Sequence, residues 1–87
     1  MVDIRIVELD SRTYQVTVVA QSTTTHHVTM QADYVQKLAG GRISNSALLK
    51  KSFEFLLQRE PNTSILRSFD LSVISRYFPE YEREISS

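Results

Sequence analysis

The chain has 87 residues, with ten basic and ten acidic side chains and no cysteine. Its length predicts one domain, residues 1–87, whose small core leaves little surplus stability. The composition excludes disulfides and thiolate metal sites, and the balanced charge argues against a strongly electrostatic nucleic-acid or membrane binder.

The N-terminal third carries strand patterns. Residues 2–9 are rich in β-branched side chains with a period of two, and residues 13–20 alternate in the same way after a polar break, which predicts a hairpin. Val19 is the apolar exception on the polar face of the second strand. Residues 21–25 are expected to be a polar loop or a frayed strand end, and residues 26–30 a short third strand.

Helical spacing begins after the third strand. Residues 31–39 predict a short helix, and Gly40 supplies the left-handed conformation that suits a helix C-terminus. Either Ser44 or Asn45 can cap the next helix, which we expect over residues 46–59.

The apolar side chains of this central helix fill an arc of about 200° at 100° per residue. A surface helix usually has an apolar stripe nearer 100° wide. We therefore expect this helix to be covered on two sides, either within the domain or by a second subunit. The apolar residues are Leu48, Leu49, Phe53, Phe55, Leu56 and Leu57.

Two prolines divide the C-terminal third into short helices. Pro61 ends the central helix, and Asn62 or Thr63 can cap a helix carrying Ile65, Leu66 and Phe69. Asp70 can cap another helix, and Pro79 suits the first turn of a last one.

The predicted fold is α+β. A three-stranded antiparallel sheet is covered on one face by the central helix, around which the short C-terminal helices wrap. The residues expected to be buried are Val2, Ile4, Ile6, Tyr14, Val16, Val18, Val28, Leu49, Phe53, Leu56, Leu66 and Ile74.

Few residues suggest chemistry. His26 and His27 are neighbours on a strand, so their side chains point to opposite faces and cannot share a metal ion. No glycine-rich phosphate loop is present, and no nucleophile has a histidine at a recognisable spacing. We therefore expect no catalytic residues, no cofactor and no metal, in a cytoplasmic protein without a secretory signal or a membrane span.

The order of a polar strand, a short helix, a glycine-bearing loop and a capped helix over residues 25–58 resembles the ribbon-helix-helix domain. The resemblance implies a dimer whose paired ribbons lie in the DNA major groove, with the N-terminus of the second helix at a phosphate. Residues 34–59 carry five basic side chains against one acidic one, which is compatible with an anion-contacting surface or with a solvated helix face. The possible nucleic-acid contacts are Thr25, His27, Thr29, Arg42, Ser44, Asn45, Lys50 and Lys51.

The C-terminal run is more specific. Its Phe53-Glu-Phe-Leu-Leu-Gln-Arg-Glu-Pro-Asn62 stretch, followed by Phe69-Asp-Leu71 and Tyr77-Phe-Pro-Glu-Tyr-Glu82, resembles a family of small bacterial proteins with no assigned activity. This resemblance implies a bacterial soluble protein and carries over no catalytic residue.

The sequence therefore favours a small non-enzymatic interaction module that binds an unknown protein partner or associates with itself as a homodimer. A dimeric DNA-binding regulator is the alternative. The possible partner surface comprises Val19, Phe55, Leu57, Tyr77 and Tyr81, of which Tyr77 and Tyr81 are expected to be the exposed members.

Overall fold

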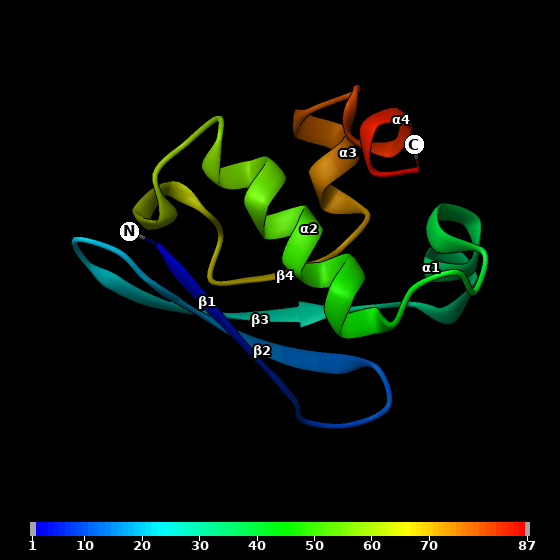
Figure 1. Cartoon of the computed structure of the whole chain (residues 1–87), viewed down its shortest axis with the longest axis horizontal. Coiled ribbons are helices and arrows are strands. Elements are labelled where there is room, and N and C mark those ends of the chain that lie inside the picture. The colour runs from blue at the N-terminus through cyan, green and yellow to red at the C-terminus, as the bar shows by residue number, and fades with distance from the viewer. Residues whose placement is uncertain (1, 87) are drawn as a thin grey trace.

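The computed structural model describes residues 2–86 and confirms an α+β fold. A mixed sheet forms one layer, and the helices pack on one of its faces (Figure 1). In chain order the elements are β1 (Asp3–Glu8), β2 (Thr13–Val19), β3 (Thr23–Thr29), α1 (Ala32–Ala39), α2 (Asn45–Leu57), the 3₁₀ turn η1 (Asn62–Ser64), β4 (Ser68–Asp70), α3 (Val73–Tyr77) and α4 (Tyr81–Ser86).

The sheet has four strands in the order β1-β2-β3-β4, one more than the three predicted. The first three are antiparallel neighbours, as expected, whereas β4 pairs in parallel with β3 through Val28 and Phe69. The sequence predicted a helix over this segment. A short helix does form at η1, but the chain then becomes extended, and the side chain of Phe69 is buried beside Phe53.

Strand β3 begins three residues earlier than predicted. Thr23, Thr24 and Thr25 pair with residues 17–19 of β2, so they are a regular part of the strand and neither a polar loop nor a frayed strand end. Threonine is β-branched and suits a strand. Thr24 points to the inner face of the sheet and is buried, and its hydroxyl has hydrogen-bond partners there that offset the cost of burying it.

The inner face of the sheet is covered by α2, and of the two residues predicted as its cap, Ser44 and Asn45, it is Ser44 that caps the helix. Ser44 Oγ accepts a hydrogen bond from the backbone N–H of Ala47 at 3.1 Å. At the end of α1, Gly40 has φ 58° and closes the helix in the left-handed conformation, again as expected. On α2, Phe53 is fully buried, and its ring centre lies 5.4 Å from that of His26 on β3.

The opposite side of α2 is covered by α3 and α4 (Figure 1). The ring of Phe55 lies edge-on to Phe78 at 5.9 Å and to Tyr81 at 5.2 Å. Arg59 stacks on the same ring at 3.6 Å and forms ion pairs with Glu80 and Glu84. The wide apolar arc of α2 is therefore covered within the chain, so it gives no reason to invoke a second subunit.

Most of the predicted core is confirmed, with two errors. Val2 lies before β1 and is 49% exposed, and Leu66 lies between η1 and β4 and is 47% exposed. Ile4 and Ile6 are only partly buried, because β1 is an edge strand. The other predicted core residues are buried: Tyr14, Val16, Val18, Val28, Leu49, Phe53, Leu56 and Ile74.

Candidate functional site

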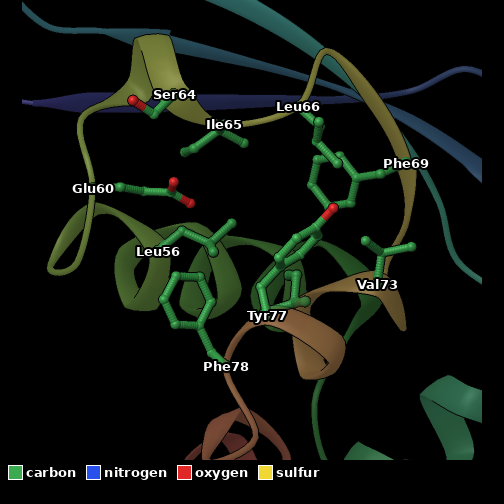
Figure 2. Close-up of a pocket in the computed structure, with 10 residues that line it drawn as sticks. Leu56, Glu60, Ser64, Ile65, Leu66, Phe69, Val73, Tyr77 and Phe78 are labelled. Atoms are coloured by element: carbon green, nitrogen blue, oxygen red, sulfur yellow. The ribbon is translucent and has the colours of Figure 1, made fainter.

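A hollow lies where the end of α2 faces α3 and the segment that leads into β4. We call it the α2–α3 pocket, and Figure 2 shows the side chains around it. Its volume is about 240 Å³, below the roughly 300–1,000 Å³ of typical small-molecule sites. Its lining residues are Leu56, Glu60, Ser64, Ile65, Leu66, Phe69, Val73, Ile74, Tyr77 and Phe78.

Two large side chains at this pocket are exposed. Tyr77 is 67% exposed and Leu66 is 47% exposed. Figure 2 shows the ring of Tyr77 reaching across the pocket from α3 toward Leu66 and Phe69. The two side chains therefore make an apolar rim around an apolar floor.

Glu60 is the one acidic residue among those that line the pocket. In Figure 2 its carboxylate points between Leu56 and Ile65 into the hollow. Within residues 2–86, no ion pair joins Glu60 to another side chain, and burial raises its pKa above the ordinary carboxyl value. A half-buried carboxylate without a counterion is costly, because its charged form has lost part of its hydration.

The pocket wall formed by Ile65 and Leu66 is held by a buried polar chain. Asn62 Nδ2 donates to Thr24 Oγ1 at 2.9 Å, and Thr24 Oγ1 lies 2.8 Å from His26 Nε2. His26 Nδ1 lies 2.8 Å from the carbonyl oxygen of Leu66, which can only accept. Nδ1 therefore carries a proton. Burial lowers the pKa of His26 and so favours the neutral ring, in which Nε2 accepts from the Thr24 hydroxyl.

This chain of hydrogen bonds assigns His26 a structural role. The side chain is fully buried and has partners at both ring nitrogens, and burial lowers its pKa. A second buried pair acts similarly between α2 and α4. Tyr81 lies 2.7 Å from Ser52 Oγ, which donates to Leu48 O, and burial raises the pKa of Tyr81 to about 12.

The predicted partner surface is only partly exposed. Tyr77 lies at the surface as expected, and Val19 and Leu57 are half-buried. The expected exposure of Tyr81 is wrong, since it is 0% exposed, and Phe55 is buried between α2 and the C-terminal helices. Both aromatic rings supply the second cover of α2, which the sequence could not distinguish from an intermolecular contact.

The predicted nucleic-acid contacts fall into two separate groups. Thr25, His27 and Thr29 alternate with buried residues of β3, so they lie on the uncovered outer face of the sheet. The other group surrounds the start of α2, on the inner side. There Ser44 caps the helix, Asn45 Nδ2 donates to Tyr14 OH, and Arg42 Nε donates to Ala39 O, while Lys50 and Lys51 are exposed. One chain does not bring the two groups onto one surface.

The pairing of β3 bears on how a ribbon could form. Residues 27–29 have β2 on one side and β4 on the other, so both of their edges are used within the chain. A ribbon that pairs with its own copy needs a free edge, and the edge strands of the sheet are β1 and the three-residue β4.

The sequence does not mark Glu60 as a site residue, and the prediction that Leu66 is buried in the core is wrong. Glu60 precedes Pro61 and looks like ordinary solvated charge at a helix end. The periodicity of the sequence does not identify Glu60 as a pocket residue, because Glu60 lines a pocket only when the segment 62–69 folds back over the end of α2.

No group of histidine, aspartate or glutamate side chains among residues 2–86 is arranged to hold a metal ion. Across the same residues, no helix has the length and apolar character needed to cross a membrane. In comparisons with known proteins, no family model, curated protein or solved structure matched the chain.

Proposed function

We propose that the protein is a small interaction module that binds a segment of another protein in the α2–α3 pocket and has no catalytic role of its own. The exposure of Leu66 and Tyr77 around an apolar hollow is the observation that carries this proposal. Tyrosine is enriched at the energetic centres of interfaces, because a large rigid ring buries much area at a low entropy cost.

The chemistry of the buried polar groups supports binding over catalysis. His26 and Tyr81 have shifted pKa values, yet each is held by hydrogen bonds inside the fold and neither lines the pocket. The pocket itself offers mainly apolar surface and one carboxylate, which suits recognition of a side chain.

Selection from a random peptide library on the immobilised chain tests the proposal. We expect enriched peptides whose binding shifts the backbone amide resonances of pocket residues, and Tyr77→Ser should weaken them about tenfold or more. Val7→Ser is the matched control, because Val7 is 53% exposed on β1 and lies outside the pocket. Failure to enrich any peptide, or equal losses in the two variants, would contradict the proposal.

Self-association through the exposed surface around Tyr77 is the other mode of interaction that we propose. The wide apolar arc of α2 does not support it, since α3 and α4 cover the second side of that helix. Light scattering at high micromolar concentration measures the mass directly. A dimer that Tyr77→Ser dissociates would make a second copy the occupant of the surface.

A dimeric DNA-binding regulator is the alternative proposal. Its support is the capped start of α2 with the exposed Lys50 and Lys51 nearby. Titration of mixed duplex DNA at low and moderate salt tests it, since phosphate contacts require salt-sensitive binding. Absence of binding at low ionic strength would exclude this alternative.

A further inference from the structure

The α2–α3 pocket combines two features that favour different ligands. Its walls are apolar and aromatic, whereas the Glu60 carboxylate points into it. The neighbouring cation of the same turn, Arg59, is already engaged with Glu80, Glu84 and the Phe55 carbonyl oxygen. The unpaired negative charge is therefore available to a ligand from outside the chain.

A neutral apolar ligand would bury this carboxylate further without compensating it, which costs free energy. An anion would be repelled. A ligand with an apolar stem and a cationic head satisfies both features, since the stem covers Leu56 and Leu66 while the head meets Glu60. Lysine has this construction, because its methylene stem packs on apolar surface while its ammonium group stays polar.

We propose that the α2–α3 pocket receives a lysine side chain of the partner segment, with Glu60 as its counterion and the ring of Tyr77 beside its stem. This inference rests on the proposed function and specifies the partner's anchoring residue. The pocket of about 240 Å³ holds a side chain, not a large cofactor. The aromatic side chains Phe69, Tyr77 and Phe78 also line it, and aromatic faces attract ammonium groups.

Two small probes separate charge recognition from apolar binding. n-Butylammonium chloride reproduces the lysine side chain, and n-butanol has the same stem with a neutral head. Each is titrated into the ¹⁵N-labelled protein while sodium chloride holds the ionic strength constant. We expect the amides of Glu60, Ile65 and Tyr77 to shift, with butylammonium binding about two- to fivefold more tightly than butanol.

The discriminating variant is Glu60→Gln, which keeps the size of the side chain and removes its charge. The preference for butylammonium should disappear in this variant, and butanol should bind as well as before or better. Glu54→Gln makes the same charge change at an exposed position of α2 outside the pocket, and it should keep the preference. The ¹⁵N spectra also report whether each variant is folded.

Equal binding of the two probes to the wild-type chain would overturn the lysine inference and leave an apolar interaction site in place. A preference that survives in Glu60→Gln would overturn it as well, by assigning the charge effect to another group. Absence of any shift at the pocket would also overturn it, and the peptide selection would then decide the broader proposal independently.

Discussion

The hydroxyl of Thr24 is the central link of the buried chain that joins β3 to the pocket wall. It accepts from Asn62 Nδ2 at 2.9 Å and donates to His26 Nε2 at 2.8 Å, and the side chain is 3% exposed. Thr24→Val has nearly the same shape and removes both hydrogen bonds. No cavity is created, so the change in stability reports the polar chain alone.

The magnitude follows from counting the lost partners. Each neutral hydrogen bond contributes about 1 kcal/mol net, and a buried group left without a partner costs more than that average. His26 Nε2 loses its donor, whereas Asn62 keeps its second bond to Ser22 O at 2.9 Å. We expect Thr24→Val to lower the free energy of unfolding by about 2–3 kcal/mol. In a chain of this size, each 1 kcal/mol lowers Tm by about 4–8 °C.

Urea denaturation followed by circular dichroism measures this loss, and an unchanged m-value confirms that the unfolded state is not the source. Thr25→Val is the matched control, because Thr25 is the next residue of β3 and points to the outer face. It should change stability by less than about 0.5 kcal/mol. A similarly small effect of Thr24→Val, or equal losses in both variants, would refute the assigned network.

Burial lowers the pKa of His26 below its ordinary value of 6.5, so the free energy of unfolding should fall as pH drops below about 6.5, by at most about 1.4 kcal/mol per pH unit. Denaturation curves measured across that range test this, and a slope that persists in His26→Gln would assign it to another group. Tyr81→Phe removes the hydroxyl bonded to Ser52 and should cost about 1–2 kcal/mol in thermal denaturation, whereas Tyr77→Phe, at an exposed position, should be nearly neutral. Burial raises the pKa of Glu60, so the folded state favours the neutral carboxyl and loses stability as pH rises through that pKa. Glu60→Gln should therefore make the protein slightly more stable at neutral pH. A clear loss of stability in this variant would show that the carboxylate has a structural partner.

Local signals in the sequence predicted the elements whose cause is local. The period-two pattern of β2, the serine cap at Ser44 and the left-handed Gly40 all act within a few residues, and the structure contains each of them. The wide apolar arc of α2 also led correctly to two-sided burial. It could not say whether the second cover came from α4 or from another chain, because both bury the same surface.

The wrong predictions concern segments whose conformation is set by contacts with distant parts of the chain. Strand β4 has only three residues, and it is extended because it pairs with residues 27–29, about 40 positions earlier in the chain. Without that pairing, the spacing of Ile65, Leu66 and Phe69 fits a helix equally well. Thr24 is another case, since a run of threonines reads as a loop until Asn62 and His26 provide buried partners for its hydroxyl.

The same long-range contacts connect the fold to the pocket. Leu66 is exposed, yet its carbonyl oxygen is fixed by the buried His26, so the pocket wall is held through its backbone and not through burial of its side chain. Side chains in this segment are therefore free to face outward at little cost to the fold. Natural sequences depart from local consistency mainly at functional sites, and here an exposed leucine, an exposed tyrosine and an unpaired carboxylate surround one hollow.

Because the wall depends on the polar chain, Thr24→Val should weaken butylammonium binding while the pocket residues themselves are unchanged, and Thr25→Val should not. Weaker binding in Thr24→Val alone would show that β3 supports the Ile65–Leu66 wall from the side that faces away from the ligand.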